Sequence, residues 1–561
     1  MLTLKTRPFF HTLLDALSLQ DGDETAIIYV ESGKPSQTIS RRAFRAQVIE
    51  NARALRALNI QPRDLIIIAH TQNLESITLF WGAMAVGAIP SMFPTLTEKL
   101  DKGVYMKNMQ QLIAFSDVSA ILTTDEFAPT LQTAVSCPVY GSSQLTHDSA
   151  HDSGDGNDWM VTPSPDDIAL LQHSSGTTGL QKGVALSQTA VLNQLASYSD
   201  ALALTADDVI VSWLPLYHDM GLIAGFLLPL MQGIPLVLMS PFDWVRHPAL
   251  LFQAIDAHGG TLCWLPNFAY NHCARRIRPQ DVDGVSLASM RLFINCSEPV
   301  RADSHAQFLE KFSHMGLTTR NLSVSYAMAE NTFAVTQTPI SQSARLDVVN
   351  GMELSKNGRA EPITADAPHA TTHVSCGRAI ENTEIIILDG DHRPLPNRHV
   401  GQISIKGDCM LAAYHNRPNL RPFTGDGFYL TGDRGYLADG ELYIIGRAKD
   451  LIINAGKNVY PQDIEAIVNE VDGVKNGRAV VFGVQDKREG TELIAVVAQV
   501  QTGDVATRKI INKAIRQAVA KHSTVTASYV QLVGDKWILK TSSGKLARAA
   551  NRDKWLAERQ R

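Results

Sequence analysis

The chain has 561 residues, which is too long for one hydrophobic core and predicts two or more domains. Of these residues 45% are hydrophobic and 19% are charged, a balance typical of a globular protein. Its formal net charge of −5 provides no broad positive field and therefore argues against a nucleic-acid partner. The six cysteines are scattered without a Cys-x-x-Cys pair, which indicates free thiols in a reducing cytoplasm and argues against a disulfide framework or a zinc site.

The N-terminal part of the chain alternates between two hydrophobic periods. Residues 41–58 and 74–86 have the apolar spacing of helices, whereas residues 65–69 and 120–122 are short apolar runs typical of buried strands. This alternation, which continues to about Pro165, predicts a layered α/β domain whose strands are largely parallel.

Neither a signal peptide nor a membrane span is expected. Residues 1–20 contain no long apolar core followed by a small-residue cleavage site. The uncharged stretch from Gly221 to Met239 is interrupted by Pro229 and Pro235, so it predicts a buried helix followed by a buried strand. We therefore expect a cytoplasmic protein without a transmembrane segment.

A loop rich in glycine and hydroxyl side chains follows the strand expected at residues 167–171. It reads Ser-Ser-Gly-Thr-Thr-Gly-Leu-Gln-Lys-Gly-Val from Ser174 to Val184 and leads into a second strand, after which Ser187 is a candidate helix cap. Glycine allows backbone N–H groups to turn toward an anion, and Lys182 adds positive charge. The pattern predicts a phosphate-binding loop that is not a Walker loop, with a plain surface loop as the structural alternative.

A strand expected at residues 209–212 runs into a proline-containing turn that carries His218 and Asp219. Ligands collect at the carboxyl ends of strands in open α/β sheets, so this turn is a candidate binding site. A histidine in a turn is also commonly a capping or structural residue, and the residues alone leave that alternative open.

Five further segments complete an ordered series of motifs. They are Asn295–Pro299 (Asn-Cys-Ser-Glu-Pro), Ser323–Thr332 (Ser-Val-Ser-Tyr-Ala-Met-Ala-Glu-Asn-Thr), Tyr429–Asp433 (Tyr-Leu-Thr-Gly-Asp), Gly446–Asn458 and Leu539–Arg548 (Leu-Lys-Thr-Ser-Ser-Gly-Lys-Leu-Ala-Arg). With the glycine-rich loop, they resemble the motifs of the adenylate-forming superfamily, which includes acyl-CoA synthetases, peptide-synthetase adenylation domains and luciferase-like enzymes. The resemblance covers nearly the whole chain. It implies an α/β fold with a large layered N-terminal domain, residues 1–446, and a small hinged C-terminal α+β domain, residues 447–561.

The resemblance implies ATP and Mg²⁺ as cofactors. The residues that it assigns to the nucleotide are Ser174, Ser175, Gly176, Thr177, Thr178, Gly179, Lys182, Ser297, Glu298, Pro299, Tyr326, Ala327, Asp433, Arg447 and Lys449. Tyr326 and the turn at 297–299 are expected beside the adenine, and Asp433, in a Gly-Asp pair typical of a turn, is expected to accept hydrogen bonds from the ribose. Arg447 would contact ribose or phosphate, and Lys449 would lie at the hinge. Ala327 departs from the family, which usually has glycine there; the departure bears on how the backbone fits around the nucleotide, although alanine is the smallest possible change.

The same resemblance assigns metal and catalytic roles. Glu330 and Thr177 are expected to bind magnesium, because this hard cation prefers oxygen ligands. Lys545 and His218 are expected to be catalytic, with Lys545 stabilising the negative charge that develops at the α-phosphate. The implied reaction joins a carboxylate to AMP with release of pyrophosphate, and a thiol then attacks the acyl-AMP after the small domain has rotated.

Two segments favour the fatty acyl-AMP ligase branch of the superfamily. The Tyr-Pro-Gln-Asp-Ile-Glu run at 460–465 resembles that branch, and residues 349–376 resemble its extra insertion, although a plain surface loop is the alternative for the latter. This implies activation of a medium- or long-chain fatty acid and transfer to the phosphopantetheine thiol of an acyl carrier protein. A fatty acyl-CoA ligase and a non-catalytic nucleotide-binding or scaffolding relative are the alternatives.

The basic C-terminal end is a candidate docking surface for such a carrier protein. Its cations are Lys536, Lys540, Lys545, Arg548, Arg552 and Lys554. Complementary charge would attract an acidic partner, and a merely solvated basic face is the alternative.

Overall fold

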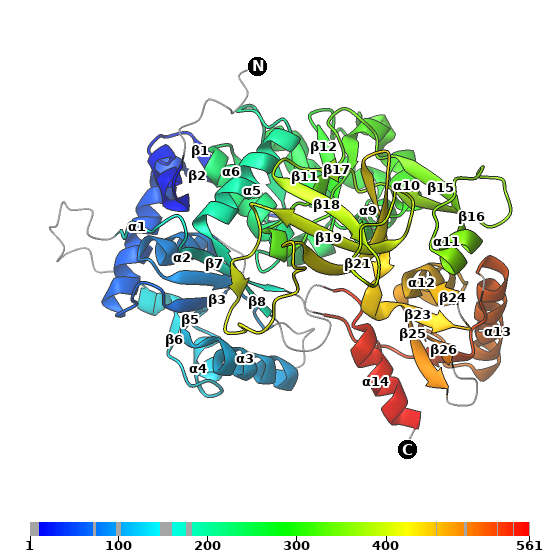
Figure 1. Ribbon diagram of the computed structural model, residues 1–561. Coiled ribbons are helices and arrows are strands. Elements are labelled where there is room, and N and C mark those ends of the chain that lie inside the picture. Colours follow the sequence, from blue (N-terminus) through cyan, green and yellow to red (C-terminus); the bar gives the residue numbers. More distant parts are fainter. Residues whose placement is uncertain are drawn as a thin grey trace.

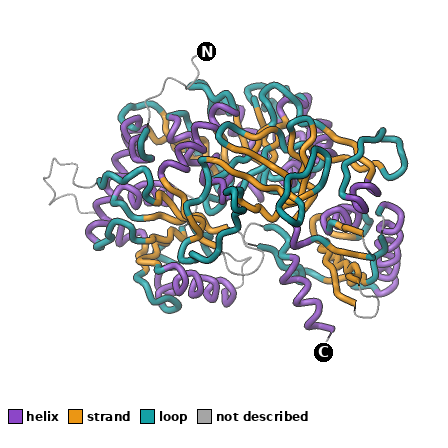
Figure 2. The backbone as a smooth tube through the Cα atoms, in the orientation of Figure 1, coloured by secondary structure: helices purple, strands orange, loops and turns teal. Residues whose placement is uncertain are grey.

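The computed structural model describes residues 10–70, 74–96, 102–145, 160–174, 182–455, 457–486, 491–523, 525–541 and 544–559. Figure 1 shows a large body and, at its lower right, a smaller one that contains α12, α13 and the strands β23 to β26, with α14 beside it. The backbone trace in Figure 2 shows that strands of both bodies are covered by helices. The predicted α/β class is confirmed.

A seven-stranded sheet forms the centre of the large domain, in the order β13-β12-β11-β9-β10-β1-β2. Every neighbouring pair is parallel except β1 and β2. Its strands are β1 (Thr25–Val30), β2 (Gln37–Ser40), β9 (Ile210–Ser212), β10 (Leu236–Met239), β11 (Leu262–Leu265), β12 (Leu292–Asn295) and β13 (Leu322–Val324). The motifs at 213–219, 295–299 and 325–332 follow the carboxyl ends of β9, β12 and β13, which places them along one edge of the sheet.

A second, wholly parallel sheet has the order β4-β3-β5-β6 and confirms the parallel strands expected near the N-terminus. Its strands are β3 (Leu65–Ala69), β4 (Ile89–Met92), β5 (Val118–Thr123) and β6 (Val139–Gly141). The helices of the large domain are α1 (Arg41–Ala57), α2 (Leu74–Ala85), α3 (Lys102–Ser116), α4 (Ala128–Gln132), α5 (Gln188–Ala201), α6 (Leu228–Gln232), α7 (Pro241–Arg246), α8 (Ala249–His258), α9 (Asn267–Arg276), α10 (Ala302–Phe312) and α11 (Gly351–Asn357).

The two strands predicted around the glycine-rich loop pair with each other. β7 (Ile168–Ser174) and β8 (Lys182–Ser187) are antiparallel, and the short strand β20 (Ala413–Tyr414) pairs with the other edge of β8. Ser187 caps α5 by accepting a hydrogen bond of 3.1 Å from the backbone N–H of Ala190, as predicted. The hairpin therefore holds Ser174 and Lys182 side by side in register.

An antiparallel sheet, β18-β19-β21-β22, completes the large domain next to the hinge. Its strands are β18 (Thr383–Leu388), β19 (Gly401–Gly407), β21 (Tyr429–Ala438) and β22 (Glu441–Arg447), and two short strands, β14 (Thr336–Gln337) and β17 (Arg378–Ala379), form a separate pair.

The segment that could have been a plain surface loop instead forms a strand–helix–strand unit. β15 (Leu346–Asn350) and β16 (Ala370–Val374) pair in antiparallel register, and α11 follows β15 directly. Asn350 caps α11 by accepting from two backbone N–H groups of the first turn. The Ser355 hydroxyl donates a hydrogen bond of 2.8 Å to the carbonyl oxygen of Asn458, so this unit contacts the chain just beyond the hinge.

The smaller body has its own hydrophobic cores, as expected for a separate domain. It consists of β23 (Ile452–Asn454), β24 (Lys457–Val459), α12 (Pro461–Asn469), β25 (Val474–Asp486), β26 (Thr491–Val500), α13 (Val505–His522), β27 (Tyr529–Val533) and α14 (Arg548–Arg559). The sheet order is β25-β26-β27, which makes β27 an edge strand. We call these elements the small domain.

The uncharged stretch at 221–239 folds as predicted into buried helix and strand. A π-helix (Met220–Leu227) continues into α6 and then β10, and nearly all of its side chains are buried. Within the part of the chain that the structure describes, no helix is long and apolar enough to cross a membrane. All six cysteines are buried and unpaired.

Candidate active site

His218 and Asp219 lie in the turn between β9 and the π-helix. The Asp219 carboxylate accepts a hydrogen bond of 2.9 Å from the backbone N–H of Met220 and caps this helix, and π-helical turns are frequent at functional sites. Gly221 allows the close approach of the two segments, because a Cβ atom there would lie 2.2 Å from the carbonyl oxygen of Pro215. The turn thus presents His218 in a fixed position.

The His218 imidazole is neutral at physiological pH. Burial, assisted by the positive charge of Lys545, lowers its pKa to about 3. Its Nε2 atom is shielded from solvent and has no hydrogen-bond partner among the described residues. A buried polar atom without a partner is costly, which indicates that a ligand completes its hydrogen bonding.

Lys545 reaches this turn from the small domain. Burial raises the pKa of the Asp219 carboxyl, and the positive charge of Lys545 opposes that rise. The same lysine lowers the pKa of the Cys296 thiol, which burial raises to about 12. Its own segment is held by two hydrogen bonds between Thr541 and the Lys545 backbone, of 2.8 and 3.2 Å. The structure therefore brings the two predicted catalytic residues together although 327 positions separate them in the sequence.

Tyr326, Asp433 and Arg447 form one connected group. The Tyr326 hydroxyl donates a hydrogen bond of 2.7 Å to the Asp433 carboxylate, and Arg447 forms an ion pair of 3.1 Å with its other oxygen. Burial and the neighbouring Asp433 raise the pKa of Tyr326 well above its usual value, so the phenol keeps its proton. Asp433 lies within β21 opposite Arg447 in β22, not in a turn as its Gly-Asp pair suggested. Two of the predicted nucleotide residues, Asp433 and Arg447, thus lie opposite each other on paired strands, and Tyr326, which follows β13, contacts Asp433.

Glu330 is held by a residue that the motifs did not identify. The Tyr414 hydroxyl donates a hydrogen bond of 2.8 Å to Oε1 of Glu330 and lies 2.7 Å from the Tyr429 hydroxyl. Lys182 places its ammonium group 4.9 Å from the centre of the Tyr414 ring. Because β20 pairs with β8, Tyr414 connects the strand after the phosphate loop to the predicted magnesium ligand.

The turn at 295–299 follows β12, and two of its residues are constrained, one by its backbone conformation and the other by a hydrogen bond. Ser297 has a φ of 70°, a left-handed conformation that is uncommon outside glycine. The Glu298 carboxylate accepts a hydrogen bond of 2.9 Å from the backbone N–H of Phe268, so at least one of its oxygens is engaged in the fold. Pro299 follows in the same turn, and Ala327 forms an isolated bridge with Ala334 after β13.

Lys449 lies in the 3-10 turn Ala448–Asp450 that follows β22. Burial, together with the positive charge of Arg447, lowers the pKa of its ammonium group. The residues Ser175, Gly176, Thr177, Thr178 and Gly179 of the predicted phosphate loop lie outside the described residues. Their predicted contacts with nucleotide and metal remain predictions.

The aromatic residues near the site are mostly part of the hydrophobic core. Trp264 donates a hydrogen bond of 2.8 Å to the Tyr198 hydroxyl, and Tyr270 is fully buried among other rings. The Trp244 ring stacks on Trp213 with 3.6 Å between centroids. Phe268 is the exception, with 41% of its surface exposed.

The comparisons with known proteins agree with this fold. A family model described as AMP-binding enzyme matches residues 15–415, and a second, described as AMP-binding enzyme C-terminal domain, matches residues 463–545. The chain belongs to the AMP-binding enzyme family. The superfamily predicted from the ordered motifs is therefore confirmed.

Its relatives include several named ligases. The chain is 29% identical to the long-chain fatty acid–AMP ligase FadD32 of Mycolicibacterium smegmatis, over 95% of this chain and 92% of that protein. It is also 29% identical to the medium-chain fatty acid–[acyl-carrier-protein] ligase JamA of Moorena producens, over 98% and 96%. A Caulobacter vibrioides protein named provisionally as an acyl-CoA synthetase has the same identity over 98% and 96%.

A solved structure from a study of fatty acyl-adenylate ligases of E. coli and L. pneumophila has a similar fold. It superimposes with a TM-score of 0.88 at 27% identity and covers 98% of both chains. The predicted large and small domains correspond to the architecture of these enzymes, and the boundary at 446/447 stays a prediction.

Proposed function

We propose that this protein uses ATP to convert a medium- or long-chain fatty acid to acyl-AMP and then transfers the acyl group to the phosphopantetheine thiol of an acyl carrier protein. The observation that carries the proposal is the position of Lys545, whose charge acts on both His218 and Asp219 across the domain boundary. A cation beside a buried neutral imidazole provides a site for a carboxylate. The fatty acid ligases among the relatives support the choice of substrate.

In the first step, a carboxylate oxygen of the fatty acid attacks the α-phosphorus of ATP. A bond forms between this oxygen and phosphorus, the bond from phosphorus to the oxygen of the β-phosphate breaks, and pyrophosphate leaves. The unpartnered Nε2 of His218 can donate to the substrate carboxylate in the tautomer that carries a proton there. Lys545 stabilises the charge that accumulates on the phosphoryl oxygens, and such preorganised charge is often the largest contribution to catalysis.

The nucleotide would lie between β13 and β21. In that position Asp433, oriented by Tyr326 and Arg447, accepts hydrogen bonds from the ribose hydroxyls. The positive charge of Arg447 offsets the negative charge of Asp433, which reduces the repulsion between this carboxylate and the phosphates of ATP.

Glu330 and Thr177 would hold the magnesium ion. The Tyr414 hydroxyl donates its hydrogen bond to Oε1 of Glu330. Among the described residues Oε2 has no hydrogen-bond or ion-pair partner, so the carboxylate retains one oxygen for a cation. One carboxylate is enough, because Mg²⁺ is commonly held by one or two carboxylates together with substrate phosphates and water. When bound, the ion neutralises phosphate charge and favours departure of pyrophosphate.

In the second step, the carrier thiol releases its proton to solvent and its sulfur attacks the acyl carbonyl carbon. The thioester forms, the bond between this carbon and the phosphate oxygen breaks, and AMP leaves with the electrons of that bond. The small domain would rotate about Lys449 between the steps, which withdraws Lys545 from His218 and opens a path for the thiol. The strand–helix–strand unit of β15, α11 and β16 would restrict that rotation, because its Ser355 hydroxyl is hydrogen-bonded to the carbonyl oxygen of Asn458 beyond the hinge. A restricted opening favours the long, slender phosphopantetheine arm of a carrier protein over the bulkier nucleotide of free CoA.

A fatty acyl-CoA ligase is the second candidate, favoured by the provisional name of the Caulobacter vibrioides relative. The two functions differ only in the acceptor. Preformed dodecanoyl-AMP would be supplied to the enzyme with CoA in one reaction and a holo acyl carrier protein in another. Transfer to the carrier protein without acyl-CoA formation is the expected result. Efficient acyl-CoA formation with no carrier acylation would overturn the proposed acceptor in favour of the second candidate.

A further inference from the structure

The two domains carry opposite formal charge. Residues 447–561 contain 20 lysines and arginines against 12 aspartates and glutamates, a net of +8, so the whole-chain value of −5 leaves −13 for residues 1–446. The helix α13 contributes five of those cations, Arg508, Lys509, Lys513, Arg516 and Lys521, and contains no carboxylate. The positive charge of the small domain is therefore concentrated along one helix.

The basic C-terminal end considered from the sequence is less available. Arg548 is paired with Asp450 at 2.8 Å and with Glu465 at 2.6 Å. Lys554 donates a hydrogen bond of 2.8 Å to the carbonyl oxygen of Trp537, and Lys545 faces the active site. Because these three cations have internal roles, an external partner is better sought elsewhere on the small domain.

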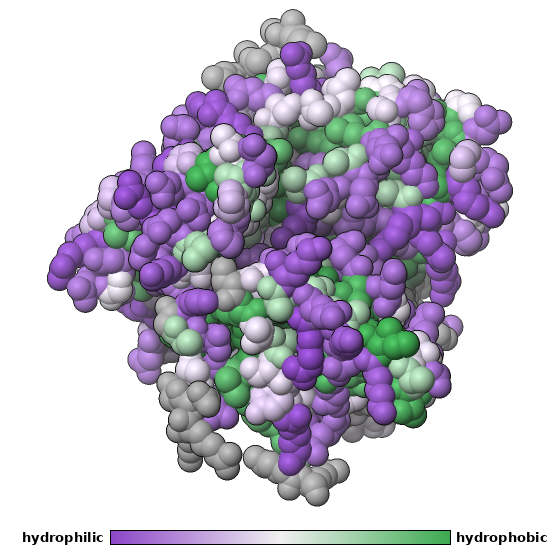
Figure 3. Space-filling model, turned by 90° about the vertical axis from the view of Figure 1, so that its right-hand side faces the viewer, coloured by the Kyte–Doolittle hydropathy of each residue, from purple (hydrophilic) through white to green (hydrophobic). Residues whose placement is uncertain are grey.

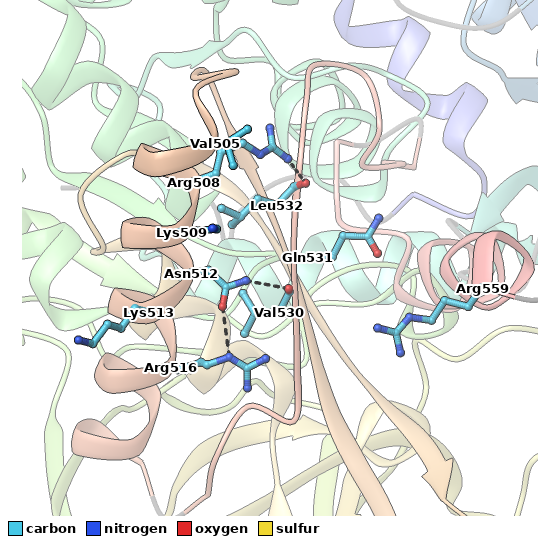
Figure 4. A pocket seen from close by; sticks show the side chains of 10 residues that line it. All are labelled: Val505, Arg508, Lys509, Asn512, Lys513, Arg516, Val530, Gln531, Leu532 and Arg559. Atoms are coloured by element: carbon cyan, nitrogen blue, oxygen red, sulfur yellow. Dashed lines mark hydrogen bonds between the residues drawn. The ribbon is translucent and has the colours of Figure 1, made fainter.

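A groove of about 600 Å³ lies between α13 and the edge strand β27, with Arg559 of α14 on its far side. Figure 4 shows the α13 side chains on one wall and Gln531 and Arg559 across from them. The lining residues are Val505, Arg508, Lys509, Asn512, Lys513, Arg516, Val530, Gln531, Leu532 and Arg559. Five of these ten side chains are cationic and none is acidic.

Part of the α13 wall protects the sheet edge. Arg508 donates to the carbonyl oxygen of Leu532, Asn512 to that of Val530 at 3.0 Å, and Arg516 to that of Ala527 at 2.5 Å. These residues occur every four positions and satisfy edge carbonyl groups that would otherwise be open to another strand. They are structural, and they close this edge to a β-strand partner.

Two lysines of the groove have no such role. Lys509 and Lys513 are exposed, lie one helical turn apart, and have no ion-pair or hydrogen-bond partner within the described ranges. On the far side, the Arg559 guanidinium is held over the rings of Trp555 and Tyr529 at 4.1 and 4.3 Å. The groove thus presents three cations to solvent.

Apolar surface accompanies these charges on α13. Val505, in the groove, and Ile510, on the same helix, are 67% and 68% exposed. Figure 3 shows hydrophobic patches among hydrophilic surface on the half of this face that contains the small domain. Cations one turn apart with neighbouring exposed aliphatic groups match an amphipathic helix that carries carboxylates one turn apart.

We propose that this groove docks an acidic helix of the acyl carrier protein, with carboxylates on Lys509 and Lys513 and an apolar side chain on Val505. The inference rests on the proposed function and adds the docking surface to it. β27 precedes the Lys545 segment and α14 follows it, so a partner seated in the groove is attached to the domain that carries the catalytic lysine. Docking would then keep the carrier with that domain as it rotates.

The test compares the double variant Lys509→Glu/Lys513→Glu with Lys102→Glu/Lys107→Glu, which makes the same change in net charge at two exposed lysines of α3. ATP–pyrophosphate exchange, trapping of acyl-AMP by hydroxylamine, and acylation of a holo carrier protein that the wild type accepts would be measured at several salt concentrations. The groove variant is expected to raise the KM for the carrier by about tenfold or more and to flatten its salt dependence, with exchange and trapping unchanged.

Three results would overturn the docking proposal. An unchanged carrier KM in the groove variant would do so directly, and an equal defect in the α3 control would show that only net charge matters. Competition between millimolar inorganic phosphate and the carrier protein at constant ionic strength would show that the groove is a site for small anions. By contrast, a wild type that forms acyl-AMP but acylates CoA and no carrier would refute the proposed acceptor itself.

Discussion

Arg301 of the large domain donates a hydrogen bond of 2.8 Å to the carbonyl oxygen of Gln462 at the start of α12 in the small domain. Its guanidinium also lies 3.7 Å from the Asp463 carboxylate, whose pKa burial raises to about 6 while Arg301 opposes the rise. This contact fastens the small domain in the orientation that brings Lys545 to His218. A rotation of the small domain must break it.

We therefore expect Arg301→Ala to slow adenylation more than thiol transfer. A half-exposed charged hydrogen bond contributes about 1 kcal/mol, which corresponds to a roughly fivefold lower rate if it is made only in the adenylating orientation. ATP–pyrophosphate exchange measures the first step, and transfer from supplied acyl-AMP measures the second. Equal effects on both steps would show that Arg301 merely supports the fold.

Replacement of Asp433 by Asn should weaken nucleotide binding. The substitution keeps the shape but removes the charge that pairs with Arg447 and one acceptor for the ribose. The KM for ATP should rise by about tenfold or more, since charged hydrogen bonds contribute about 1.5–3 kcal/mol each. Tyr326→Phe, which removes only the hydroxyl that orients Asp433, should have a smaller effect in the same direction. A normal KM for ATP with a raised KM for the fatty acid would contradict this assignment.

Glu330→Gln tests the magnesium site. The amide is isosteric and can still accept from Tyr414, but it is a poorer ligand for a hard cation. The magnesium concentration needed for half-maximal exchange should increase by about an order of magnitude, an effect of about 1.4 kcal/mol. Tyr414→Phe provides the matched control, because it leaves the carboxylate in place. An unaltered magnesium dependence in Glu330→Gln would exclude Glu330 as a ligand.

His173 should make stability depend on pH. It precedes Ser174, lies 2.9 Å from the Ser91 hydroxyl through Nδ1, and burial lowers its pKa to about 4. Because the unfolded chain binds this proton at about pH 6.5, the contribution of His173 to the unfolding free energy is intact above pH 6.5. It falls by about 1.4 kcal/mol per unit toward pH 4, or about 2 kcal/mol by pH 5.

Denaturant unfolding of the wild type and His173→Gln at pH 7 and pH 5, followed by tryptophan fluorescence, measures this contribution. The variant should lose about 2 kcal/mol less than the wild type over that interval. Parallel losses in the two proteins would mean that His173 does not titrate as described.

Local patterns in the sequence were sufficient for the elements that position the site. The strand–loop–strand around Ser174 and Lys182, the cap at Ser187 and the turn at His218 all follow from short-range periodicity and capping chemistry. The family resemblance assigned catalytic roles to both Lys545 and His218, although no local pattern joins the two residues.

The remaining contacts depend on pairings that no local pattern specifies. Tyr414 lies 84 positions from Glu330, in a two-residue strand too short to have a period, so the sequence gives no sign of their hydrogen bond. Residues 349–376 resemble the insertion of the fatty acyl-AMP ligase branch, but a plain surface loop was the alternative because the order of this segment comes from long-range strand pairing and contact with Asn458 rather than from an apolar face. The basic face of α13 is visible as a helical pattern, but its role in covering β27 requires the tertiary structure.

The most direct test of the adenylating ligase is the separation of its two steps in Lys545→Ala. Loss of the only lysine brought to His218 within the described residues should reduce ATP–pyrophosphate exchange by about 10²–10³-fold or more. Transfer from supplied acyl-AMP to a thiol acceptor should stay close to the wild-type rate, and Lys540→Ala should leave both steps largely unchanged. Exchange at the wild-type rate in Lys545→Ala would contradict the proposed mechanism.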